Sequence, residues 1–314
     1  MNRPASTSGL QVATDVGYEL AEGPVWDARR GALWWVDILA GDVHQGVLRA
    51  DGTLRHRRRH TVVGSAGTVA LAASGDIVVA GADRLHRIDA MGRVQAGAPA
   101  IDGAARRFND GRPDPRGRML VGTKAHHTGT PDDRGEVLLR FETDGSVTVI
   151  DDDLTLSNGL GWSGDGRLLY TVDTLSRRIF VRDYDPETGA WGIRRTFLVL
   201  EDGYPDGLTL DAADHVWVAI WGGGCVLRVA PDGRVVERID VPAPNVSSMA
   251  FAGQDLDVLV ITTARENLTD AQLDRHPLSG RLFTTRTAHR GSRSTDWNGC
   301  LGADTAPAPE GGDR

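Results

Sequence analysis

The sequence lacks the features that mark several protein classes. Its only two cysteines, Cys225 and Cys300, are too few for a disulfide framework, which predicts a reducing, cytoplasmic location. No apolar stretch reaches the about 18 residues that a membrane-spanning helix needs, and residues 1–10 lack the apolar core of a secretion signal. We therefore expect neither export through a standard signal nor a membrane partner.

The chain also has no excess of basic charge. Its formal net charge of −8 argues against a nucleic-acid partner. The one basic run, residues 55–60, is better interpreted as a solvated outer hairpin. The Gly-x-Ser-x-Gly pattern of a hydrolase nucleophile turn is missing as well, so no serine nucleophile of that kind is expected.

Glycine, in contrast, is abundant, with 39 residues in 314, and long helical patterns are few, which favours an all-β fold. Six segments share one design, a polar turn followed by four to six β-prone residues. They span residues 31–37, 75–81, 117–123, 166–172, 214–220 and 256–262, at intervals of 42–49 residues. Weaker copies with Asp-Gly hairpin turns follow inside most units. About four short strands per unit, six times over, predict a six-bladed β-propeller.

The repeat also sets the expected domain boundaries. We predict a single propeller domain over residues 13–286, because the repeating units fill that range. Residues 1–12 and the Gly/Ala/Pro-rich residues 287–314 are predicted to be disordered. The expected assembly state is a monomer or a weak homo-oligomer.

Four short polar motifs recur at one phase of this repeat, eight or nine positions before the turn residue that precedes a strand core. They are Glu22-Gly23-Pro24, Asn109-Asp110-Gly111, Asn158-Gly159 and Asp206-Gly207. Residues that repeat in phase occupy equivalent places in a symmetric fold, so these side chains are expected to converge at one mouth of the central channel. Converging oxygen atoms are how proteins hold a hard divalent cation.

Each motif taken singly is also a common turn pair. Four of them in phase, flanked by apolar residues, favour a binding site instead, because a carboxylate in a narrow channel is unfavourable unless it is paired or bound to metal. The equivalent positions in the other two units hold Gly67 and Ser248, which we interpret as room left for a ligand. Asp37 and Asp173, which follow strand cores, are predicted to cap loops, and Trp221 either lines the site or packs in the core.

The order and spacing of four stretches carry a family resemblance. They are residues 21–27 (AEGPVWD), 107–123 (RFNDGRPDPRGRMLVGT), 157–173 (SNGLGWSGDGRLLYTVD) and 204–224 (YPDGLTLDAADHVWVAIWGGG). Over roughly residues 15–285 the chain resembles the gluconolactonase/regucalcin family of senescence-marker-protein-like lactonases. This resemblance implies a six-bladed propeller with one divalent metal at the channel mouth, and a sugar lactone as the small-molecule substrate.

Carried over by motif, the resemblance implies metal ligation by Glu22, Asn158 and Asp206. Two carboxylates and one amide oxygen suit Ca²⁺ first, and they leave Zn²⁺, Mn²⁺, Mg²⁺ and Fe²⁺ open. The metal would polarise the lactone carbonyl. Asp206 is the predicted catalytic base that activates water, with a hydroxide on the metal as the alternative.

The resemblance further implies that Arg107 and Asn109 hold oxygens of the substrate. One departure concerns a position at which many relatives carry an acidic residue that binds sugar hydroxyls. This chain has Ala125-His126-His127 there, so His127 is the predicted substrate-binding residue at that place.

The leading hypothesis is therefore a metal-dependent sugar lactonase of the gluconolactonase type, which converts an aldonolactone to an aldonic acid. Two alternatives stay open at this point. One is a non-enzymatic metal-binding or interaction propeller, since a fold does not determine a function. The other is a metal-dependent hydrolase or lyase that acts on another substrate.

Overall fold

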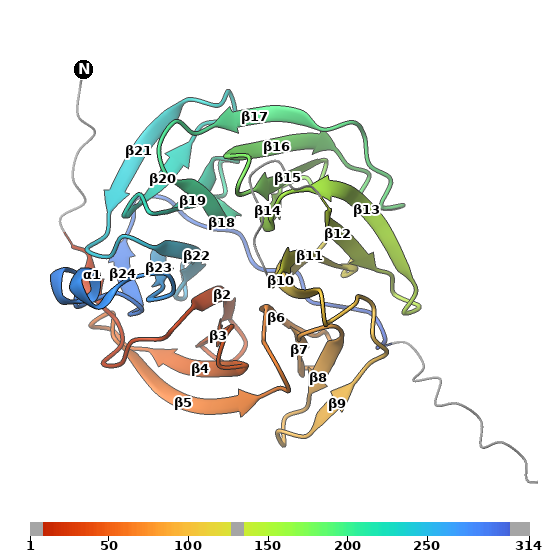
Figure 1. The fold of residues 1–314 in the computed structure, drawn as a ribbon, viewed down its shortest axis with the longest axis horizontal. Helices are drawn as coiled ribbons and strands as arrows, with labels where there is room; N and C mark the ends of the chain where they lie inside the picture. Colours follow the sequence, from red (N-terminus) through yellow and green to blue (C-terminus); the bar gives the residue numbers. More distant parts are fainter. Residues whose placement is uncertain (1–8, 127–134, 302–314) are drawn as a thin grey trace, which may run out of the picture.

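The computed structural model describes residues 9–126 and 135–301, and it shows six four-stranded antiparallel sheets arranged around a central axis (Figure 1). This confirms the predicted six-bladed β-propeller. In the first five blades the strands follow chain order from the axis outward, so the first strand of each blade is the inner one. The inner strands therefore bring distant parts of the sequence together at the axis.

The strands of blades 1 to 3 have the following bounds: β2 (Ala21–Asp27), β3 (Ala32–Asp37), β4 (Asp42–Leu48) and β5 (Leu54–Thr61); β6 (Thr68–Leu71), β7 (Ile77–Ala80), β8 (Leu85–Ile88) and β9 (Val94–Ala96); β10 (Arg106–Pro113), β11 (Met119–Ala125), β12 (Glu136–Phe141) and β13 (Val147–Leu154).

Those of blades 4 to 6 are β14 (Ser157–Trp162), β15 (Leu168–Asp173), β16 (Arg178–Asp183) and β17 (Arg195–Val199); β18 (Tyr204–Leu210), β19 (Val216–Trp221), β20 (Cys225–Val229) and β21 (Val235–Asp240); β22 (Val246–Ala252), β23 (Val258–Thr263), β24 (Phe283–Arg286) and β1 (Gln11–Val12). The one helix in the described residues, α1 (Asp270–Arg275), lies between β23 and β24, and no described helix is long and apolar enough to cross a membrane.

Blade 6 is built from both ends of the chain. The short strand β1 pairs antiparallel with β24, and the Ala13 amide donates to the Leu282 carbonyl oxygen at 2.7 Å. The prediction of disorder for residues 1–12 is therefore wrong for residues 9–12. A strand of two residues is too short to show a periodicity in the sequence. Its hydrogen bonds come from a partner about 270 residues away, which local sequence cannot reveal.

The segment 287–301 is likewise placed, although the sequence predicts a disordered tail from residue 287. It runs behind the ring from β24 toward blade 2 (Figure 1) and forms bridges from Gly291 to Asp211 and from Trp297 to Ala72. Trp297 is 3% exposed and packs in the core between blades 2 and 3. One buried aromatic side chain thus anchors a segment that contains no regular strand or helix. Residues 302–314 lie outside the described part.

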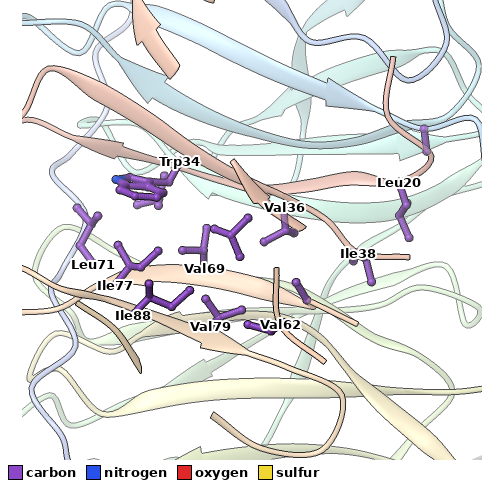
Figure 2. Packing of buried hydrophobic residues seen from close by; sticks show 14 residues of the cluster. Leu20, Trp34, Val36, Ile38, Val62, Val69, Leu71, Ile77, Val79 and Ile88 are labelled. Atoms are coloured by element: carbon purple, nitrogen blue, oxygen red, sulfur yellow. The ribbon is translucent and has the colours of Figure 1, made fainter. Parts of the chain in front are cut away.

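The cores lie between neighbouring blades. In the cluster between blades 1 and 2, Trp34 and Val36 of β3 face Ile77 and Val79 of β7 (Figure 2). The middle strands carry apolar side chains on both faces, because each blade is covered by another blade on either side. Each middle strand therefore buries apolar side chains against both neighbouring blades.

Each polar motif coincides with an irregularity in its inner strand. The register of the ladder shifts between Glu22 and Val25, between Phe108 and Gly111, between Asn158 and Leu160, and between Pro205 and Leu208. Such bulges change the direction in which a side chain projects. The motifs are therefore parts of strands, and the bulges turn their polar side chains toward the channel mouth.

The glycines of these motifs allow neighbouring inner strands to approach closely. A Cβ atom on Gly159 would collide with the Asp206 carbonyl oxygen, and one on Gly207 would collide with Ser248. A Cβ on Gly67 would lie 2.6 Å from the Asn109 carbonyl oxygen. The interpretation of Gly67 and Ser248 as room for a ligand is therefore wrong, because strand packing already fills this space.

Replacement of Trp297 by alanine should test the anchoring role of the C-terminal segment. We expect Trp297→Ala to lower the free energy of unfolding by about 3–5 kcal/mol, as for other buried aromatic truncations. Trp191, which is 37% exposed, provides the matched control, and Trp191→Ala should cost clearly less. Denaturant unfolding measures both, and equal losses would contradict the anchoring role.

The buried His44 should make stability depend on pH. Burial lowers the pKa of His44 from 6.5 to about 4 in the folded protein. The unfolded chain therefore binds this proton first as the pH falls, and up to about 3 kcal/mol of stability should be lost between pH 6.5 and 4. His44→Gln should flatten the plot of unfolding free energy against pH in this window. His276→Gln, on the exposed end of α1, should leave the slope unchanged.

Candidate metal centre

The inner strands of four blades meet around a cavity of about 350 Å³ at one mouth of the channel. Four side chains of the phased motifs line it together: Glu22 from β2, Asn109 from β10, Asn158 from β14 and Asp206 from β18. None of the four is more than 6% exposed. The expected convergence of the motifs is thus present.

Two of these side chains are carboxylic acids in a site that shields them from water. Burial is the largest cause that raises the pKa of Glu22 well above its usual range, followed by the charges of Asp206 and Asp110. The pKa of Asp206 is also raised well above its usual range, by burial and then by Asp110. Two mutually repelling buried carboxylates favour either a proton or a bound cation.

Two side-chain oxygens at this place have no hydrogen-bond partner among the described residues. The Asn158 amide nitrogen donates to Thr174 Oγ1 at 3.1 Å, and Thr174 Oγ1 donates to the Pro205 carbonyl oxygen at 2.9 Å. This orients the Asn158 amide, yet Asn158 Oδ1 and Asp206 Oδ1 are buried and have no hydrogen-bond partner among the described residues. Buried polar atoms are nearly always paired, and these two belong to residues that line one cavity, so both are available to a bound ligand.

The set of donor atoms fits a hard divalent cation. Glu22, Asn158 and Asp206 offer only oxygen, with two negative charges between them, as Ca²⁺ and Mg²⁺ prefer. The described residues contain no grouping of three or more His, Cys, Asp or Glu side chains that could hold a metal. An amide oxygen must therefore complete any site here, and Asn158 supplies one.

Asn109 and Arg107 are arranged differently. Arg107 Nη1 donates to Asn109 Oδ1 at 2.8 Å and to the Phe108 carbonyl oxygen at 2.9 Å. The Asn109 amide nitrogen donates to the Ser157 carbonyl oxygen at 3.0 Å. Because Asn109 Oδ1 already accepts a hydrogen bond from the Arg107 guanidinium, Asn109 is less suited to metal ligation than Asn158. The substrate-binding role of Arg107 and Asn109 stays a prediction, and both polar atoms of the Asn109 side chain already have partners in the protein.

Other predicted residues have varied positions. Trp221 lines the cavity, and Asp37 and Asp173 cap the loops that enter β2 and β14. Asp37 accepts the Glu19 and Leu20 amides at 3.0 and 3.1 Å, and Asp173 Oδ1 accepts the equivalent pair, Thr155 and Leu156, at 3.0 and 3.2 Å. Leu20 and Leu156 line the cavity wall. His127 lies outside the described residues.

Sequence reasoning missed two charged residues of the cavity, Lys124 and Glu266. Lys124 Nζ lies 3.5 Å from Glu266 Oε1, and both side chains line the cavity next to Arg107. Glu266 lies in the loop between β23 and β24 of blade 6, which has no counterpart in the repeat, so phase could not reveal it. A signal for Lys124 does exist, because it is the only lysine among the 35 lysines and arginines of the chain.

Fold and site together define a six-bladed propeller with an acidic, oxygen-rich small-molecule cavity on its axis. Residues 20–265 match the family model described as the SMP-30/Gluconolactonase/LRE-like region. The chain therefore belongs to this family, and the family resemblance that the motifs carried is confirmed.

Individual relatives agree with this assignment. The chain is 38% identical to 6-deoxy-6-sulfogluconolactonase of Pseudomonas putida, with 85% of this chain and 91% of the relative aligned. It is 36% identical to pentonolactonase XacC of Haloferax volcanii, with 80% and 83% aligned. The crystal structure of regucalcin from Agrobacterium tumefaciens, a calcium-binding protein, is similar with a TM-score of 0.85 at 29% identity, covering 93% of this chain and 98% of that one.

The buried carboxylates predict how divalent cations affect stability. Protein stripped with EDTA should melt at a lower temperature than protein in excess Ca²⁺, because a ligand that binds only the folded state stabilises it. Glu22→Gln should melt higher than the stripped parent when both are metal-free, since it removes a buried charge, and it should lose the response to Ca²⁺. Thermal melts of both proteins measure this, and a full Ca²⁺ response in Glu22→Gln would contradict the site.

Proposed function

We propose that this protein is a metal-dependent sugar lactonase that hydrolyses an aldonolactone to the aldonic acid. The observation that carries the proposal is the pair of unpartnered oxygens, Asn158 Oδ1 and Asp206 Oδ1, buried beside Glu22 and the Arg107 guanidinium in one small cavity. Relatives named pentonolactonase and 6-deoxy-6-sulfogluconolactonase support the reaction class.

Glu22, Asn158 and Asp206 would hold the divalent ion. Their all-oxygen composition favours Ca²⁺ over the softer alternative Zn²⁺, while Mg²⁺, Mn²⁺ and Fe²⁺ can use the same donors. When bound, the ion supplies charge that polarises the lactone carbonyl. The similarity to a regucalcin described as calcium-binding also supports Ca²⁺.

Arg107 contributes a positive charge beside the place where the carbonyl oxygen becomes an oxyanion. Its hydrogen bonds to Asn109 Oδ1 and the Phe108 carbonyl oxygen fix its orientation before substrate arrives. A donor that is oriented in advance stabilises developing charge without reorganising during the reaction. Asn109, held through the Ser157 carbonyl oxygen, fixes Arg107 in turn.

Asp206 is the residue that we assign to proton transfer. Asp206 lines the cavity and its carboxylate has two oxygens, so the group can serve the ion with one oxygen and accept a proton with the other from a water beside the lactone carbonyl. Proton acceptance by Asp206 leaves a nucleophilic oxygen to attack the ring carbonyl, and the proton then goes to the departing ring oxygen.

A calcium-binding role without turnover is the second candidate, and the similarity to regucalcins favours it. It uses the same three ligands. It differs in requiring no proton acceptor and no substrate-facing cation. A calcium-binding role alone therefore does not explain the buried Arg107–Asn109 pair.

Asp206→Asn should separate these roles. We expect it to lower kcat/KM for D-glucono-1,5-lactone and D-xylono-1,4-lactone by at least about 100-fold, because it removes both a ligand charge and the proton acceptor. A pH-indicator assay measures the acid released.

The matched control is Asp165→Asn, since Asp165 caps a turn through the Arg167 amide at 3.0 Å, away from the cavity, and this variant should keep the parent activity. EDTA treatment should abolish hydrolysis, and added divalent ion should restore it. Full activity in stripped protein, or in Asp206→Asn, would contradict the proposal.

A further inference from the structure

Lys124 is an unusual residue for this chain. The sequence contains 35 lysines and arginines, and Lys124 is the only lysine. The surface positive charge is therefore entirely arginine, and the single lysine lines the functional cavity. Its side chain is only 19% exposed, so it is no ordinary solubilising surface residue.

Lys124 places a second positive charge next to Arg107 at the cavity wall. In the β10–β11 ladder Arg107 is the direct cross-strand partner of Lys124. Directly opposed residues project to the same face, and like charges in such a pair destabilise a sheet. Two cations side by side at a cavity wall are suited to binding an anion.

Glu266 offsets this charge only in part. Its Oε1 lies 3.5 Å from Lys124 Nζ, and its charge is also the largest favourable one acting on Arg107. One carboxylate is thus shared by two cations. The other two carboxylates of the cavity, Glu22 and Asp206, are committed to the divalent ion in the proposed function, which leaves one positive charge in excess.

The ion pair is also loose enough to exchange partners. Its separation is longer than the 2.7–2.9 Å of a strong charge-assisted hydrogen bond, and both side chains keep some contact with solvent. Lysine carries a compact charge on a flexible stem, whereas arginine presents a rigid planar fork. A lysine can therefore move from Glu266 to a bound ligand within a small cavity.

We infer that Lys124 is a specificity-determining residue that binds an acidic substituent of the substrate. The substrate class is then a sugar lactone that carries a second acidic group, namely a carboxylate, phosphate or sulfonate. This rests on the proposed lactonase function, and it adds that Glu266 holds Lys124 in place until the anion arrives.

Binding of unreactive sugar acids tests this inference without any turnover. D-gluconate has one acidic group, whereas D-glucarate and 6-phospho-D-gluconate have two. In isothermal titration of Ca²⁺-loaded protein we expect the diacids to bind about 10- to 100-fold more tightly than D-gluconate, the range given by one hydrogen bond to a charged group. The carboxylate and phosphate arms identify which acidic group fits better.

The preference is the ratio of the Kd for D-gluconate to the Kd for a diacid. Lys124→Gln should reduce this preference to nearly 1, and Lys124→Arg should keep most of it because the charge remains. Glu266→Gln should increase the preference, since Lys124 is then released from its partner. The double variant Lys124→Gln/Glu266→Gln removes both charges and should show the low preference of Lys124→Gln.

Three results would overturn the inference. One is parent protein that binds D-gluconate as tightly as the diacids. Another is Lys124→Gln with its preference intact. The third is a double variant whose preference returns to the parent level, because the loss in Lys124→Gln would then come from the unpaired Glu266 carboxylate. Hydrolysis of D-glucono-1,5-lactone, measured in parallel, reports on the lactonase function separately.

Discussion

The cost of burying negative charge on the propeller axis governs the organisation of this protein. Glu22 and Asp206 lie in one cavity, shielded from water, and each raises the free energy of the other's ionised form. Nearby Asp110 adds to the repulsion in both cases. A folded protein tolerates such a cluster when a cation neutralises it, and the unpartnered oxygens of Asn158 and Asp206 are available to that cation.

The fold assembles this cluster by repetition. The inner strands β2, β10, β14 and β18 each contribute one polar side chain to the channel mouth beside a bulge. At Gly159 and Gly207 the glycine that follows lets the next inner strand approach. Loop caps by Asp37 and Asp173 hold the strand entries at equivalent places in blades 1 and 4. Apolar cores pack between the blades and support these positions.

Much of this is predictable because the repeat phase encodes both the fold and the convergence of Glu22, Asn158 and Asp206. Phase carries no information about side chains outside the repeat, which is why Glu266 was missed. It also cannot distinguish a small residue that leaves space from one that permits close packing, as at Gly67. Trp297 anchors its segment through contacts with blades distant in sequence, and composition alone could not reveal them.

The most direct test of the central claim is the stoichiometry of cation binding. Titration of EDTA-stripped protein with Ca²⁺, Mg²⁺, Mn²⁺ and Zn²⁺ should show one tight site per chain for at least one of these ions. That site should be lost in Asp206→Asn and retained in Asp165→Asn. Stripped protein that binds none of these ions yet folds and hydrolyses lactones at the untreated rate would contradict the account, as would undiminished binding in Asp206→Asn.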